Sequence, residues 1–158
     1  MKKLLYLFLA ITVACSSDDN SNEEPENQLF LDIYDGFVWQ VEQPTGDYFS
    51  DKVTFYSDPS SFSILYDGAC DTAIFGDPYP FTDDGVVIGE VTYSIQNEEL
   101  NNIVIFGQFV DNDGNLSPVT RIITCTVSSG GNALLLEDSF AEPDTDTYII
   151  APNEFPCN

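Results

Sequence analysis

The stretch Glu90-Val91-Thr92-Tyr93-Ser94-Ile95-Gln96 alternates apolar and polar side chains along its whole length. In an extended chain Val91, Tyr93 and Ile95 lie on one face, and the polar residues lie on the other. The same period of two recurs over residues 36–42. An α-helix would need apolar residues three or four positions apart. This pattern therefore predicts half-buried β-strands.

Further segments share these strand features. They are residues 52–55, 62–66, 70–75, 102–110, 119–127, 133–137 and 147–150. With the first two they predict an all-β chain of about eight or nine strands. The only helical turn that we expect lies within residues 28–34.

Turn residues separate the strand candidates at short intervals. Asp67-Gly68, Asp84-Gly85, Asp113-Gly114 and Gly130-Gly131 supply the positive φ angles that tight hairpins require. Neighbouring strands should therefore be antiparallel and joined in order. We expect an up-and-down antiparallel β-barrel, because closure removes exposed sheet edges, and a β-sandwich is the alternative.

The charge of the chain excludes several classes of function. Four Lys and Arg stand against 27 Asp and Glu, for a net charge of −23. Nucleic-acid binding depends on basic residues, so we expect no nucleic-acid partner. The chain has no His, which excludes His-based catalytic triads and His-ligated zinc. A hydrophobic content of 43% nevertheless predicts a packed domain.

The first residues resemble a lipoprotein leader. Lys2 and Lys3 precede an apolar stretch that is too short to span a bilayer, which predicts a signal peptide over residues 1–14. Thr12-Val13-Ala14-Cys15 resembles a bacterial lipobox. That resemblance implies lipidation of Cys15 and attachment to a membrane, whereas an ordinary cleavage region is the alternative.

Residues 15–28 predict an acidic, flexible tether, because they include five acids and no large apolar residue. Asp18 and Asp19, close after Cys15, resemble the export signal of Bacteroidota surface lipoproteins. We expect an outer-membrane lipoprotein that faces the cell surface, with the periplasmic face as the alternative. Residues 29–158 should form one domain.

The domain resembles the lipocalin-like domain of Bacteroidota lipoproteins. The resemblance rests on a helical turn, then Tyr34-Asp35-Gly36-Phe37-Val38-Trp39, then successive antiparallel strands. Lipocalins carry Gly-x-Trp, whereas two residues separate Gly36 from Trp39 here. The resemblance implies that Gly36, Trp39 and Arg121 close the barrel, with Arg121 across the Trp39 ring. Pairing of Arg121 with a surface Asp is the alternative.

The resemblance also bears on the cysteines. If Cys15 is lipidated, Cys70, Cys125 and Cys157 remain, so at most one internal disulfide can form. Lipocalins commonly link the C-terminal segment to a mid-barrel strand, which implies the pair Cys70–Cys157. Cys125 would then be a buried free thiol.

Several aromatic residues are candidate ligand contacts. Trp39, Tyr93 and Phe106 could line a barrel cavity. Tyr79 and Phe81 lie in Asp77-Pro78-Tyr79-Pro80-Phe81, which we interpret as a stiff loop because proline cannot pair within a central strand. Their rings could stack on a sugar or cover the barrel mouth, and ordinary packing is the alternative.

Acidic clusters raise the questions of metal binding and catalysis. Asp111 and Asp113 are calcium candidates, but their segment lacks the spacing of an EF-hand, so a hairpin turn is favoured and only an adventitious divalent cation is expected. Adjacent carboxylates on turns do not form a hydrolytic pair. We therefore expect no cofactor and no enzymatic activity.

Two functions remain. The first is a membrane-anchored, monomeric lipoprotein whose lipocalin-like barrel binds a small hydrophobic or glycan-type ligand at the cell envelope. The second is a structural or interaction protein of the outer membrane with a filled barrel. An open interior cavity would favour the first function.

Overall fold

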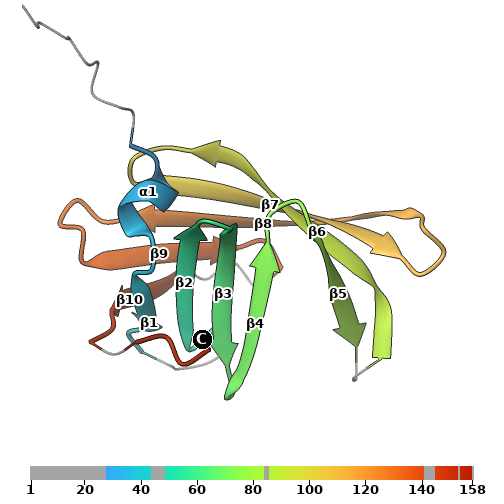
Figure 1. The fold of residues 1–158 in the computed structure, drawn as a ribbon, viewed down its shortest axis with the longest axis horizontal. Coiled ribbons are helices and arrows are strands. Elements are labelled where there is room, and N and C mark those ends of the chain that lie inside the picture. Colours follow the sequence, from blue (N-terminus) through green and yellow to red (C-terminus); the bar gives the residue numbers. More distant parts are fainter. Residues whose placement is uncertain (1–27, 44–48, 84–85, 141–144, 153, 158) are drawn as a thin grey trace, which may run out of the picture.

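The computed structural model describes residues 28–43, 49–83, 86–140, 145–152 and 154–157. A short helix precedes ten strands (Figure 1). The elements are α1 (Phe30–Tyr34), β1 (Val38–Val41), β2 (Lys52–Ser57), β3 (Ser60–Tyr66), β4 (Ala69–Ile74), β5 (Pro78–Asp83), β6 (Val86–Glu98), β7 (Asn102–Asp111), β8 (Leu116–Val127), β9 (Ala133–Asp138) and β10 (Thr145–Ile150). The predicted signal peptide and Cys15 lie outside the described residues, as does the tether apart from residue 28.

All ten strands belong to one sheet in the order β4-β3-β2-β1-β10-β9-β8-β7-β6-β5, and every neighbouring pair is antiparallel. The first and last strands pair with each other, with Trp39 opposite Ile150. This closure leaves β4 and β5 as the two edges. The fold is thus an up-and-down, nearly closed barrel, which confirms the predicted fold class.

The strand β5 corrects one interpretation. Residues 77–81 were expected to form a stiff loop, yet residues 78–83 pair with β6, with Tyr79 opposite Val91. The proline argument excludes only a central strand, and β5 is an edge strand. Pro78 and Pro80 are two residues apart, so their nitrogens point to the same edge of β5. Neither nitrogen can donate a hydrogen bond, which disfavours strand pairing along that edge.

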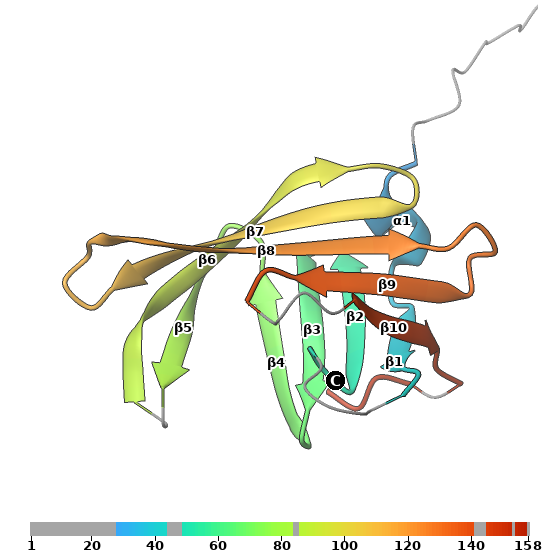
Figure 2. The same cartoon turned by 180° about the vertical axis from the view of Figure 1, so that it is seen from behind.

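The open side of the barrel lies between β4 and β5. Both strands diverge from their short connection at residues 75–77, as the two opposite views show (Figures 1 and 2). Within this connection Gly76 has a φ of 88° and its N–H donates to the carbonyl of Tyr93 on β6. The connection is thereby held against β6 while the two strand edges remain unpaired.

The core follows the predicted alternation. On β7, Ile103, Ile105, Gly107 and Phe109 are buried, whereas the residues that alternate with them are only partly buried. The helix α1 adds Phe30, whose ring packs edge-on against Phe55 of β2 at 5.2 Å. The backbone N–H of Leu31 donates to the carboxylate of Glu98 at the end of β6. These contacts attach α1 to the barrel wall.

The three cysteines of the described residues agree with their predicted roles. A disulfide joins Cys70 on β4 to Cys157, with a Cα–Cα distance of 5.7 Å. This confirms the predicted pair and ties the C-terminal segment to one edge of the open side. Cys125 on β8 is free and fully buried, and burial raises the pKa of its thiol. In the described part of the chain, no helix is long and apolar enough to cross a membrane.

Candidate functional site

A cavity of about 360 Å³ opens beside the unpaired edges of β4 and β5. We call it the seam cavity. Its lining residues come from β3, β4, β5, β6 and β8 and from the segment before β2. They are Phe49, Phe62, Ile64, Asp71, Ala73, Tyr79, Pro80, Phe81, Thr82, Val91, Tyr93 and Arg121.

Aromatic rings form much of this wall. Tyr93 is 5% exposed and packs edge-on against Phe62, with ring centroids 5.1 Å apart. Phe62 also contacts Phe75 at 5.8 Å. Tyr79 and Phe81 reach the cavity from the edge strand β5. Such rings offer flat apolar faces to a ligand.

Asp71 supplies a carboxylate to the same cavity. It pairs with Ile64 in the sheet register, and Ile64 pairs with Val53, so all three side chains are on the inner face. The phenol of Tyr79 donates a hydrogen bond of 2.5 Å to Oδ1 of Asp71 across the open side. Partial burial, together with this hydrogen bond, raises the pKa of Tyr79. A carboxylate has about four acceptor positions, so Asp71 can also accept a ligand hydroxyl.

Arg121 is held in place by several partners. Its Nε donates to Asp138 at 3.1 Å, its Nη2 forms an ion pair with the same carboxylate, and its Nη1 donates to the phenol of Tyr93 at 3.3 Å. Desolvation is the largest single effect on the Arg121 pKa and works to lower it, but the hydrogen bonds and charges of Asp138 and Tyr93 together outweigh it, so this pKa is raised. The guanidinium also lies over the rings of Phe49 and Phe140, at 5.2 Å and 5.7 Å.

The predicted stacking of Arg121 on Trp39 is therefore wrong. The guanidinium lies over the rings of Phe49 and Phe140, whereas the Trp39 ring packs beside Tyr34 and Phe37. The alternative of a surface Asp partner is also inexact, because Asp138 is only 8% exposed.

Gly107 makes room for this arrangement. It stands between Tyr93 and Arg121 in the sheet register. A Cβ atom on Gly107 would lie 2.8 Å from Cε1 of Tyr93 and 3.3 Å from Cβ of Arg121. Because Gly107 has no side chain, the side chains of Tyr93 and Arg121 can contact each other above it.

Of the five predicted ligand contacts, three line the seam cavity and two do not. Tyr79, Phe81 and Tyr93 line the seam cavity. Trp39 does not, because it is fully buried in the core beside Tyr34 and Phe37, and its indole N–H has no hydrogen-bond partner. Phe106 does not either, because its neighbours Ile105 and Gly107 occupy the inner face of β7 and turn Phe106 to the other face.

Several lining residues escaped sequence reasoning. Phe49, Phe62 and Asp71 were not predicted as site residues, nor was Asp138, which pairs with Arg121. Their role depends on which strands are neighbours and in what register, and local alternation does not carry that information. Asp71 does follow Cys70 directly, so the predicted disulfide was the nearest signal to it.

The calcium candidates belong to a hairpin turn. Oδ1 of Asp111 accepts hydrogen bonds from the backbone N–H groups of Asp113 and Asn115, and Gly114 has a φ of 82°. The hydrogen bonds from Asn115 above all lower the pKa of Asp111. These contacts confirm the favoured turn interpretation. Among the described residues, no group of three or more His, Cys, Asp or Glu side chains could hold a metal ion.

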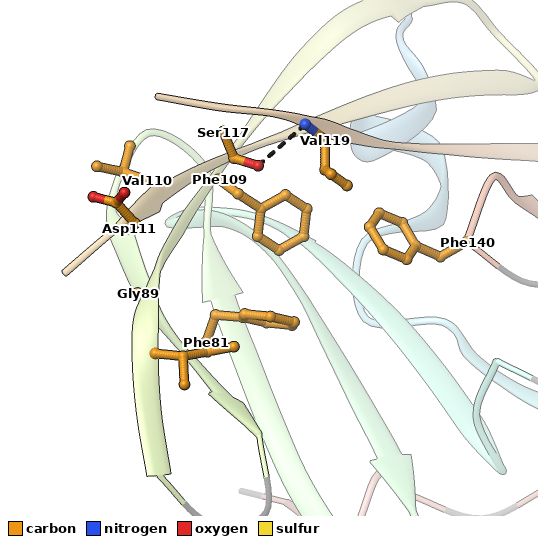
Figure 3. Close-up of a pocket in the computed structure, with 9 residues that line it drawn as sticks. Phe81, Gly89, Phe109, Val110, Asp111, Ser117, Val119 and Phe140 are labelled. Carbon is orange, nitrogen blue, oxygen red and sulfur yellow. Dashed lines mark hydrogen bonds between the residues drawn. The ribbon is translucent and has the colours of Figure 1, made fainter. Parts of the chain in front are cut away.

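Phe81 also lines a second cavity, of about 260 Å³, which lies between two pairs of strands, β5–β6 and β7–β8, that we call the arms. We call it the arm cavity. The side chains of Phe81, Phe109 and Phe140 converge on it (Figure 3). Its other lining residues are Ile88, Gly89, Val110, Asp111, Ser117 and Val119.

No protein-family model, curated protein or solved structure matches this chain. The functional conclusion therefore rests on the two cavities and the chemistry of their walls.

Proposed function

We propose that the protein is a non-enzymatic binding protein whose seam cavity takes a small, neutral, glycan-type ligand. The observation that carries this proposal is the combination of aromatic walls with hydrogen-bonding groups in one cavity. Tyr79, Phe81 and Tyr93 offer ring faces, while Asp71 and Arg121 supply an acceptor and donors. A sugar ring presents the same combination, with apolar C–H faces and a rim of hydroxyl groups.

The size and polarity of the cavity support this class of ligand. Its volume of about 360 Å³ falls within the range of about 300–1,000 Å³ that is typical of small-molecule sites. A purely hydrophobic ligand would remove water from Asp71 and Arg121 without replacing their hydrogen bonds, which is costly. A ligand with hydroxyl groups avoids that cost.

The charges near the cavity favour a neutral ligand over an anion. Asp138 neutralises Arg121, so the carboxylate of Asp71 leaves the lining with one excess negative charge. The whole chain carries a net charge of −23. An anionic ligand would be repelled both at a distance and within the cavity.

The cellular setting is part of the same proposal. The leader over residues 1–14 and the lipobox-like Cys15 support a lipid-anchored protein of the outer membrane, which we propose is monomeric. The acidic tether favours the cell-surface side over the periplasmic face. The nearly closed barrel supports a lipocalin-like binding role at the envelope.

The proposal can be tested by NMR titration of the full chain with three neutral probes: methyl β-glucoside, methyl β-galactoside and methyl β-N-acetylglucosaminide. At least one should shift the signals of Tyr93, Phe81 and Ala73 in a saturable manner. Ala73→Leu should abolish the shifts, because Ala73 is 6% exposed and the larger side chain fills the cavity. Ala69→Leu is the matched control, since Ala69 is exposed on the same strand and lines neither cavity.

Equal binding by the two leucine variants, both folded by circular dichroism, would place the ligand elsewhere and overturn the proposal. The absence of saturable shifts with all three probes would also overturn it. The latter result would favour the second function, a structural or interaction protein.

A further inference from the structure

The arm cavity offers a ligand almost nothing but apolar contacts. Its polar members are Asp111 and Ser117, and both already have partners. Asp111 accepts the hydrogen bonds of its hairpin turn, and the hydroxyl of Ser117 accepts the backbone N–H of Val119 at 3.1 Å (Figure 3). The remaining side chains are aromatic or aliphatic. This cavity therefore differs in chemistry from the seam cavity.

One side chain is common to both cavities. Phe81 lines each of them and packs edge-on against Phe109, with ring centroids 4.9 Å apart. Phe109 contacts Phe140 at 5.5 Å, and Phe140 in turn lies against Arg121 of the seam cavity. The polar and the apolar cavities are thus adjacent, with Phe81 as their shared wall.

The apolar lining is also unusually exposed. Ile88, Val119 and Phe140 are between 42% and 50% exposed, and Phe81 is 38% exposed. Contiguous exposed apolar side chains commonly mark a binding site. A ligand that covered these side chains would gain the free energy of burying apolar surface.

We propose that the natural ligand is a neutral amphiphile, whose hydroxyl-bearing head occupies the seam cavity and whose alkyl tail crosses Phe81 into the arm cavity. This inference rests on the proposed function of the seam cavity and adds the class of ligand. An alkyl glycoside has this form. The tail needs no hydrogen bonds, which matches a cavity whose polar groups already have partners.

The test compares methyl, hexyl and octyl β-glucoside, each below its micelle concentration, by NMR titration of the full chain. Affinity should rise with chain length, by at most about fourfold for each methylene buried, which corresponds to about 0.8 kcal/mol. Val119→Asn should reduce the octyl-to-methyl affinity ratio by about tenfold and leave methyl glucoside binding unchanged. Leu116→Asn should leave the ratio unchanged, because Leu116 is on the same strand, 72% exposed, and lines neither cavity.

The outcomes separate the two proposals. If methyl glucoside binds in the seam cavity but chain length has no effect, the tail site is wrong and the seam site stands. The tail site is also wrong if Val119→Asn and Leu116→Asn lower the octyl-to-methyl ratio equally. If no glucoside binds, the amphiphile proposal fails, whereas the seam-cavity proposal fails only if methyl β-galactoside and methyl β-N-acetylglucosaminide do not bind either.

Discussion

The phenol of Tyr79 donates a 2.5 Å hydrogen bond to the carboxylate of Asp71, and this bond joins β5 to β4 where the barrel wall is open. The two strands are consecutive in the chain and at opposite ends of the sheet order, with no ladder between them. Tyr79 and Asp71 also both line the seam cavity. The same side chains therefore hold the two edges together and shape the site.

Removing this bond should loosen β5. Tyr79→Phe should reduce the free energy of unfolding by about 1 kcal/mol, since one hydrogen bond is lost while the ring remains. Amide hydrogen exchange over residues 78–83 should become faster. The control is the same substitution in an Asp71→Ala background, which removes the acceptor, so the two changes should be less than additive because they remove one shared interaction. Full additivity would show that the bond contributes no stability.

The Arg121–Asp138 pair should matter more, because it is less accessible to solvent. The side chain of Asp138 is 5% exposed, and that of Arg121 is 26% exposed. Arg121→Ala would leave a buried carboxylate unpaired, so we expect a loss of about 3–5 kcal/mol in urea unfolding. Arg121→Ala with Asp138→Ala should recover part of that loss. Lys52→Ala, which removes the other cation of the described residues, should change stability by less than about 0.5 kcal/mol.

Two features of this site could be predicted from the sequence. The alternation of residues 90–96 correctly placed Val91 and Tyr93 on the inner face of β6. The turn chemistry around Asp111 correctly indicated a hairpin. Both are local patterns, and local patterns are what backbone propensity and side-chain period determine.

The errors have a different origin. Both faces of β7 carry apolar residues, so alternation could not tell whether Ile105 or Phe106 points inward. The partner of Arg121 depends on the register of β8 with β9, and the unpaired edge of β5 depends on the order of all ten strands in the sheet. These are long-range relationships, which no short stretch of sequence encodes.

Gly107 provides a direct test of packing in the site. In Gly107→Ala the new methyl group would lie 2.8 Å from Cε1 of Tyr93, so the ring must move. We expect a loss of about 1–3 kcal/mol in the free energy of unfolding, which is typical of an overpacked core. In a Tyr93→Val background, which removes the contacted atom, the same substitution should cost less. An equal cost in both backgrounds would mean that backbone propensity, and not the ring, causes the loss.

The buried thiol of Cys125 should make the free energy of unfolding depend on pH in the alkaline range. Burial, with a smaller contribution from the charge of Asp138, raises the pKa of this thiol well above its ordinary value of 9.0. Above pH 9 the unfolded chain therefore loses a proton that the folded chain keeps, which favours unfolding. The free energy of unfolding should fall by up to about 1.4 kcal/mol per pH unit from this group.

Cys125→Ala should flatten that decline between pH 9 and 10, before Tyr79 and Tyr148 begin to contribute, since the pKa of each phenol is raised from an ordinary value of 10.0. Urea unfolding at pH 7, 8, 9 and 10 can be followed through the fluorescence of Trp39, the only Trp of the chain and fully buried. Mass spectrometry after each titration should confirm that the Cys70–Cys157 disulfide is intact. If the free energy of unfolding falls equally with pH in the unchanged protein and in Cys125→Ala, the thiol does not ionise on unfolding in this range.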